Sequence, residues 1–213
     1  MVFTVKDRTT AGRMLANALG HYRNHSNFLI LAIPRGGVPL AWEIAQALHA
    51  PLDIICVRKL GCPQQPELAF SVLISRGGIK TLNQDIISEY NISDMAIEDV
   101  IEREQKELLR REQLYRGDKT AITIKDRPII IVDDGLATGA TMKVAIEVVK
   151  EQQASSIVVA VAVAPMEVIS EIRDMVNQAV YLDSPRPFYS VGEYYQEFDQ
   201  LSDPLVCQIL ARQ

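Results

Sequence analysis

Short, nearly unbroken apolar runs constrain the fold of this chain more than any other feature. They cover residues 28–33, 52–57, 129–132, 156–163 and 179–182. A strand that is apolar throughout, rather than alternating with polar residues, is typical of a parallel sheet covered on both faces. Helical patterns lie between the runs, so we expect right-handed crossovers and an α/β fold with an open parallel sheet flanked by helices.

Cap residues place the ends of the predicted helices. Thr9 or Thr10 is expected to cap the first helix and Gly20 to end it. Pro165 suits the first turn of a helix that runs to about Val176. The other predicted helices cover residues 38–48, 139–152 and a last helix that starts at Asp203-Pro204.

Residues 61–126 interrupt the alternation of strands and helices. The sequence predicts a loop over 63–66, a hairpin formed by 67–74 and 79–82 around Gly77-Gly78, and a charged helix from Ser93 or Asp94 to about Tyr115. The helix carries i,i+4 ion pairs, Glu102 with Lys106 and Glu107 with Arg111, and is either a solvated face or a partner surface. We predict one domain over 1–213, with an insertion or hood at about 61–126 and a C-terminal hood segment at about 183–213.

The composition of the chain argues against some classes of binding partner. The 213 residues include 22 Lys and Arg against 27 Asp and Glu, a net charge of −5, which argues against a protein that grips a nucleic-acid backbone. The 3 cysteines form no CxxC pair, which indicates a reducing, cytoplasmic setting. The purest apolar run, 157–164, is far shorter than the roughly 20 residues of a membrane-spanning helix. We expect no membrane or nucleic-acid partner, and a homodimer stays open.

Two adjacent acids and a Gly/Thr loop follow the third apolar run. Asp133 and Asp134 stand at the end of the strand, on the sheet edge where open α/β folds bind ligands. The loop leads into a helix and offers backbone N–H groups and two hydroxyls in Ala137, Thr138, Gly139, Ala140 and Thr141. Amides at a helix N-terminus favour a phosphate, and paired carboxylates accept hydrogen bonds from a vicinal diol. Ribose 5-phosphate satisfies both, whereas a turn with a helix cap explains only part of the run.

The segment 132–141 resembles the phosphoribosyl pyrophosphate (PRPP) signature of type I phosphoribosyltransferases. Segments 33–41, 57–61, 66–69 and 187–192 resemble a subgroup of predicted phosphoribosyltransferases whose acceptor is undefined. The resemblance implies a parallel sheet with helices on both sides and a smaller hood over the site. It assigns the ribose hydroxyls to Asp133 and Asp134, and the 5-phosphate to the loop from Ala137 to Thr141.

The resemblance also implies a pyrophosphate loop after the first strand. Arg35 supplies a forked cation, and Gly36 and Gly37 let the backbone turn tightly and present N–H groups; the alternative is an ordinary turn with a surface arginine. Arg58 and Lys59 are expected to end the second strand on the same edge and bind pyrophosphate, or else to be solvated. The loop 60–65 could close over the site as a mobile cover.

Several aromatic residues gather near the C-terminus and are either a local core that fixes the hood or rings that stack on a base. They are Tyr181, Phe188, Tyr189, Tyr194, Tyr195 and Phe198. Arg186 departs from the subgroup pattern, in which an acid is more common, so its role stays open.

Taken as the resemblance implies, the chain would transfer ribose 5-phosphate from Mg-PRPP to an unidentified base and release pyrophosphate. Catalytic roles would fall to Asp133, Asp134, Arg35 and Lys59. The Mg²⁺ would be carried mainly by PRPP, so no protein metal site is expected. The alternative is a PRPP- or nucleotide-sensing regulator without catalysis. Synthases of PRPP resemble two such units joined, and 213 residues leave room for one.

Overall fold

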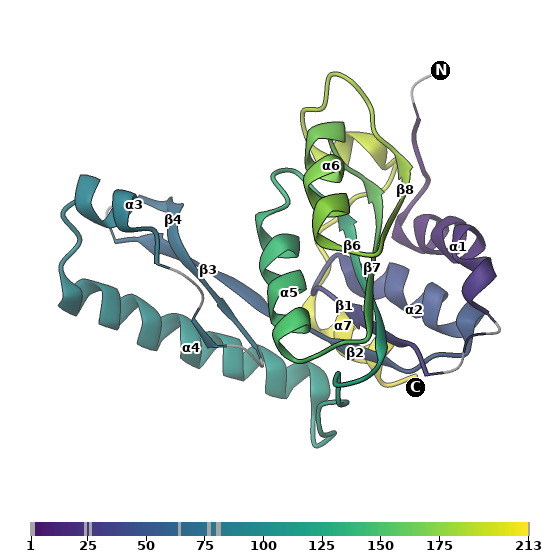
Figure 1. Cartoon of the computed structure of the whole chain (residues 1–213), viewed down its shortest axis with the longest axis horizontal. Helices are drawn as coiled ribbons and strands as arrows, with labels where there is room; N and C mark the ends of the chain where they lie inside the picture. The colour runs from purple at the N-terminus through teal and green to yellow at the C-terminus, as the bar shows by residue number, and fades with distance from the viewer. Residues whose placement is uncertain are drawn as a thin grey trace.

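A parallel sheet forms the centre of the molecule. The computed structural model describes residues 3–23, 25, 27–63, 65–75, 78–79 and 82–212. The sheet has the strand order β2-β1-β6-β7-β8 (Figure 1). Its strands are β1 (Leu29–Ala32), β2 (Leu52–Ile54), β6 (Pro128–Gly135), β7 (Ser156–Val163) and β8 (Gln178–Asp183). The predicted open parallel α/β fold is confirmed.

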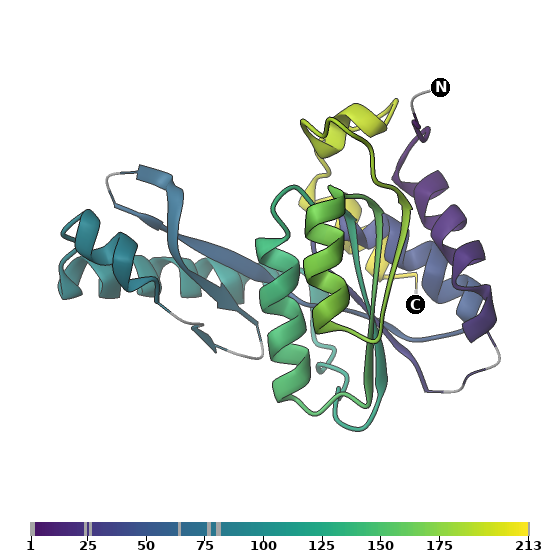
Figure 2. The ribbon, with the colours of Figure 1, turned by 45° about the horizontal axis from the view of Figure 1, so that its top comes forward.

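Helices cover both faces of this sheet (Figures 1 and 2). One face carries α1 (Arg8–Ala18), α2 (Gly37–Leu48) and α7 (Asp203–Leu210), and the other carries α5 (Ala140–Glu151) and α6 (Met166–Met175). Successive side chains of a strand point to opposite faces. In β1, Ile30 and Ala32 therefore pack with α1 and α2, while Leu29 and Leu31 pack with α5. Because both faces are buried, the run is apolar at every position. Short 3₁₀ helices occupy Gly20–Tyr22 and Val191–Tyr194.

The insertion forms an arm that projects from the sheet (Figure 1). It consists of β3 (Val57–Cys62), β4 (Gln65–Ile74), β5 (Gly78–Ile79), α3 (Gln84–Glu89) and α4 (Asp94–Arg116). The strands pair antiparallel in the order β3-β4-β5 and pack on α4. Leu60, Phe70, Val100 and Leu108 are buried between the arm strands and the helix. The arm therefore has an apolar core that continues the core of the sheet.

The second predicted strand is wrong in its length. β2 ends at Ile54, and Val57 begins β3, which pairs with β4 instead of the parallel sheet. Ile55 and Cys56, between the two strands, are buried, so the apolar run continues across the junction and conceals it. Arg58 and Lys59 therefore lie inside the arm strand, not at the end of a sheet strand.

The predicted loops at the tip of the arm are also corrected. Cys62 ends β3 and Gln65 already begins β4, so residues 60–62 and 65–66 belong to strands and not to the predicted loops. Leu60 and Cys62 are buried in the arm. β4 and β5 form the predicted hairpin. Gln64, Gly77, Lys80 and Thr81 lie outside the described residues.

The helix caps differ from expectation at two places. Asp7, not Thr9 or Thr10, caps α1, because its Oδ1 accepts a hydrogen bond from the Thr10 N–H at 2.7 Å, and the helix ends at Ala18, before Gly20. Pro165 is the cap residue before α6 and not part of its first turn. The predicted cap of α4 at Ser93 and both of its i,i+4 ion pairs are confirmed, whereas α3, capped by Asn83, was not predicted.

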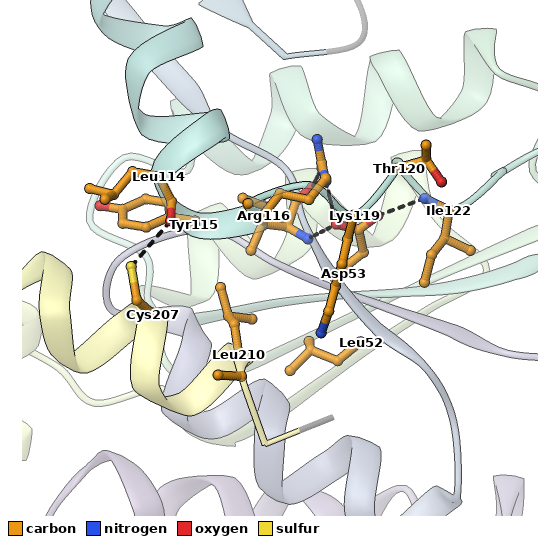
Figure 3. A pocket seen from close by; sticks show the side chains of 13 residues that line it. Leu52, Asp53, Leu114, Tyr115, Arg116, Lys119, Thr120, Ile122, Cys207 and Leu210 are labelled. Atoms are coloured by element: carbon orange, nitrogen blue, oxygen red, sulfur yellow. Dashed lines mark hydrogen bonds and ion pairs between the residues drawn. The ribbon is translucent and has the colours of Figure 1, made fainter.

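A buried aspartate of the edge strand β2 binds the end of α4 and the segment after it, where the arm joins the sheet (Figure 3). Asp53 is 7% exposed; its Oδ1 accepts from the Arg116 Nη2 at 3.0 Å and its Oδ2 from the Ile122 N–H at 2.8 Å. Arg116 also donates to the Ile54 carbonyl at 3.3 Å. A cavity of about 280 Å³ lies here, between β2, the end of α4 and α7. Asp53 thus holds both the last turn of α4 and the segment that follows it.

We predict that Asp53→Ala lowers the free energy of unfolding by about 1–3 kcal/mol, because Arg116 keeps only Glu112 as a carboxylate partner and the Ile122 N–H loses its acceptor. Urea unfolding followed by circular dichroism measures the change. The control is Glu102→Ala, which removes an exposed ion pair with Lys106 on α4 and should leave the unfolding midpoint unchanged. An equal effect of both variants would contradict the anchoring role.

Candidate active site

Two glycines bring the loop after β1 against the end of β6. The strands pair in parallel, with Ala32 opposite Val132. A Cβ atom on Gly36 would lie 2.2 Å from the Asp134 Oδ2, and one on Gly37 would lie 2.4 Å from the Val132 carbonyl oxygen. Only glycine fits either position without displacing its neighbour. The structure therefore joins the predicted pyrophosphate loop and the predicted ribose-binding acids at one edge of the sheet.

The two acids at that edge have different partners. The Asp133 Oδ1 accepts a hydrogen bond from the Asp134 N–H at 2.9 Å. The Asp134 Oδ2 accepts from the Arg8 Nε at 2.8 Å, and the Tyr195 hydroxyl donates to the Asp134 carbonyl at 2.7 Å. Arg8 and Tyr195 were not singled out from the sequence as partners of these acids. Each is more than 60 residues from Asp134, so no local spacing could have indicated the contact.

Burial raises the pKa of both acids and so shifts both toward their neutral forms. Burial raises the pKa of Asp133 well above its ordinary value, and the neighbouring Asp134 charge raises it further. Burial also raises the pKa of Asp134, and the hydrogen bond and charge of Arg8 oppose that rise. The site therefore holds one acid with a cation partner beside a second acid whose charge is costly. Shifted carboxyl groups in such a position are typical of a functional site.

The predicted phosphate loop begins α5. Gly139 has a φ of 71°, the left-handed region that glycine adopts freely, and its carbonyl accepts from the Lys143 N–H at 2.9 Å. Ala137 and Thr138 are exposed, while Ala140 and Thr141 are in the first turn of the helix, Thr141 partly buried. The Ala140 N–H lies 3.4 Å from the Thr138 Oγ1. The first-turn amides of α5 thus face the same sheet edge as the two acids.

The loop between β1 and α2 has a cis peptide bond between Pro34 and Arg35. The Arg35 Nη1 lies 3.7 Å from the Asp203 Oδ1 at the start of α7. The Gly37 N–H, expected to be offered to a ligand, donates to the Ile33 carbonyl at 3.0 Å. The Gly37 N–H is therefore not free to bind a ligand, and the role of Gly37 is to let its backbone lie close to β6.

Arg58 and Lys59 point to opposite faces of β3, as neighbouring residues of a strand do. The Arg58 Nε donates to the Glu104 Oε2 of α4 at 2.9 Å, so its guanidinium is held inside the arm. Lys59 is exposed and lines a cavity of about 330 Å³ together with Ala140 and Val144 of α5. Of the two cations, Lys59 lines a cavity with Ala140 of the predicted phosphate loop, whereas Arg58 is held toward α4.

The C-terminal segment covers the end of β6. A Cβ atom on Gly135 would lie 2.5 Å from the Val191 side chain, so this segment packs directly on the strand. Tyr194 and Tyr195 are buried, each stacked on another ring, whereas Tyr189 is 73% exposed. Tyr194 and Tyr195 thus belong to a local core, and the ring of Tyr189 is exposed. Arg186 pairs with Glu167 at 2.6 Å on the exposed side of α6.

Within the described ranges, no group of three or more His, Cys, Asp or Glu side chains is arranged to hold a metal ion. Over the same residues, no helix combines the length and the apolar character that crossing a membrane requires.

A family model described as "Phosphoribosyl transferase domain" matches residues 8–183. This chain belongs to the phosphoribosyl transferase domain family. A "Putative phosphoribosyl transferase" of Mycobacterium tuberculosis is 41% identical over 207 residues, which is 97% of this chain. The chain spans 46% of the length of that relative.

Solved structures agree with this phosphoribosyl transferase fold. TT1426 from Thermus thermophilus superposes with a TM-score of 0.81 and 34% identity, covering 100% of this chain and 99% of the other. AQ2163 from Aquifex aeolicus, at 14% identity and a TM-score of 0.51, is similar in fold alone and covers 83% of this chain and 74% of its own. The resemblance to the type I phosphoribosyltransferases is thereby confirmed.

We predict that Asp133→Asn stabilises this phosphoribosyl transferase domain above the ordinary Asp pKa of about 4. Because the pKa of Asp133 is raised in the folded chain, the folded state binds more protons, and stability falls as the pH rises toward that higher value. Asparagine does not ionise, so the variant does not lose stability in this way, and its Oδ1 can still accept a hydrogen bond from the Asp134 N–H. Tm should therefore rise by about 2–4 °C near neutral pH and less in acid.

Thermal unfolding measured from acid to neutral pH tests this prediction. The control is Asp174→Asn on the exposed face of α6, for which we expect no pH-dependent change in Tm. If Asp133→Asn lowered Tm at every pH, the Asp133 charge would not be destabilising in the fold.

Proposed function

We propose that this chain transfers ribose 5-phosphate from Mg-PRPP to a nitrogenous acceptor, such as a nucleobase, and releases pyrophosphate. The bond from ribose C1 to the pyrophosphate oxygen breaks, and its electron pair leaves with pyrophosphate. The acceptor nitrogen forms a new bond to C1 and loses its proton. The transition state carries positive charge on the ribose ring, so the catalytic task is positioning and charge stabilisation.

The observation that carries this proposal is the fit of Gly36 and Gly37 against the end of β6. The fit joins the loop after β1 to the two acids at the end of β6, the strand that leads into α5. PRPP would bind along this edge. Asp133 and Asp134 would accept hydrogen bonds from the ribose hydroxyls. The first-turn amides and the hydroxyls of Thr138 and Thr141 would hold the 5-phosphate.

Cations on two elements would stabilise the departing pyrophosphate. Arg35 lies in the loop after β1, and its 3.7 Å contact with Asp203 is loose enough to be exchanged for phosphate oxygens. Lys59 faces the start of α5 from the arm. The Mg²⁺ would arrive with PRPP and be held mainly by phosphate oxygens and water, because Mg²⁺ prefers these to a full set of protein ligands. When bound, the metal would neutralise phosphate charge.

The double variant Asp133→Asn, Asp134→Asn should lose PRPP affinity by at least about tenfold, because two charged acceptors of the ribose diol become neutral amides. Calorimetric titration with Mg-PRPP measures the affinity, and circular dichroism checks that the fold is intact. A folded double variant with normal PRPP affinity would contradict the assignment of the ribose site.

A pyrophosphate-release assay with Mg-PRPP and a panel of nucleobases separates an enzyme from a sensor. We expect release with at least one base, abolished in the same double variant. Tight PRPP binding without release for any base would favour the alternative, a PRPP-sensing regulator. Tyr189, with its exposed ring, is the residue we propose to contact the acceptor.

The neighbouring cations of β3 offer a matched pair of variants. Lys59→Ala should weaken Mg-PRPP binding by about tenfold, since it removes a charge beside the phosphate loop. Arg58→Ala should leave PRPP affinity unchanged and lower the thermal stability of the arm, because Arg58 is paired with Glu104. If Arg58→Ala weakened Mg-PRPP binding and Lys59→Ala did not, the arm would contact the ligand through the face of β3 that carries Arg58.

A further inference from the structure

Arg8 connects three parts of the molecule that are far apart in the sequence. Its Nε lies 2.8 Å from the Asp134 Oδ2, and its Nη1 donates to the Asp199 carbonyl at 2.9 Å. Its Cζ lies 3.9 Å from the centre of the Phe198 ring. The side chains of Arg8 and Asp134 are only 11% and 14% exposed. One guanidinium therefore contacts a candidate catalytic acid and the C-terminal segment at the same time.

Local structure fixes the position of Arg8. Asp7 caps α1 through its hydrogen bond with Thr10, which places Arg8 at the first position of the helix. A Cβ atom on Gly12 would lie 2.7 Å from the Leu40 Cα, so α1 packs with its backbone directly against α2. α2 in turn begins at Gly37, beside β6. Arg8 is thus held by the same helix pair that forms the edge of the site.

We propose that Arg8 is a positioning residue for PRPP: it keeps the Asp134 carboxylate oriented beside Asp133 and clamps the segment 195–199 over the same sheet edge. This inference rests on the proposed function. A carboxylate can accept several hydrogen bonds, and Arg8 uses one at Oδ2, so Asp134 retains capacity for a ribose hydroxyl. The planar fork of arginine reaches Asp134 and the Asp199 carbonyl together, which a lysine ammonium cannot reproduce.

The charges around Asp134 predict a pH signature for this role. Asp133 is its neighbour in β6, Arg8 contacts it from α1 and Tyr195 from the C-terminal segment. The residue before α2 that lies against it is Gly36, which does not titrate. Arg8 opposes the rise in the pKa of Asp134. Without Arg8, Asp134 becomes harder to ionise, and a ligand that needs its carboxylate binds well only at a higher pH.

The test compares Arg8→Gln, Arg8→Lys and a control, Arg13→Gln. Arg13 lies on the same helix, but its side chain is 67% exposed and pairs with Glu43. Affinity for Mg-PRPP is measured by calorimetry between about pH 6 and pH 9, with Tm recorded for each protein. Asp133→Asn, Asp134→Asn serves as the variant without a ribose site.

We expect Arg8→Gln to bind Mg-PRPP at least about tenfold more weakly near pH 7 and to shift the pH midpoint of binding upward. Arg8→Lys should lose about threefold or more, with its midpoint near that of the natural chain, because its charge is kept but its fork is lost. Arg13→Gln should change neither quantity.

The outcomes are distinct. If the natural chain does not bind PRPP, the proposed function fails and this inference with it. If the natural chain binds and Arg8→Gln has the same affinity, or is weakened equally at every pH, only the inference about Arg8 is overturned. If Arg8→Gln does not fold, a folded Arg8→Lys with unchanged affinity overturns the inference, and a loss supports it.

Discussion

The parallel pairing of β1 with β6 is the constraint on which the site depends. It sets the loop after β1 beside Asp133 and Asp134. Gly36 and Gly37 lie so close to the Asp134 side chain and the Val132 carbonyl that neither position has room for a Cβ atom. The strands themselves are held by helices on both faces, through side chains that alternate between two buried clusters. Displacing β1 by one residue would exchange the faces of all its side chains and move the glycines away from the acids.

The same edge concentrates charge that burial makes unfavourable. Two adjacent carboxyl groups have raised pKa values, and Arg8 opposes the shift most directly at Asp134, to which it is hydrogen-bonded. Such an arrangement lowers the stability of a fold and is retained where a ligand needs it. The C-terminal segment completes this edge, since Tyr195 contacts the Asp134 backbone and Phe198 lies under the Arg8 guanidinium.

The arm and the sheet are joined by buried polar contacts as well as by apolar packing. Asp53 connects edge strand β2 to the end of α4. At the start of α7, Asp203 accepts a hydrogen bond from Tyr115 of α4 and lies close to Arg35 of the loop after β1. The position of the arm is therefore linked to the loop proposed to bind pyrophosphate. Lys59, on the arm strand that faces α5, lines a cavity with Ala140 at the start of that helix, where the 5-phosphate is proposed to bind.

By itself the sequence determined the parallel sheet, most helices and the segment of acids, glycine and threonine after β6, because apolar periodicity and loop chemistry act over a few residues. It did not reveal that β2 ends at Ile54, since a buried run looks the same when the chain passes from one sheet to another. It gave a catalytic role to Lys59 and not to Arg58, but it could not show which face of β3 meets α5 and therefore that Arg58 pairs within the arm. The pairing of Arg8 with Asp134 joins residues 126 positions apart. Only the packing of α1 on α2 brings them together, so only the tertiary structure could decide it.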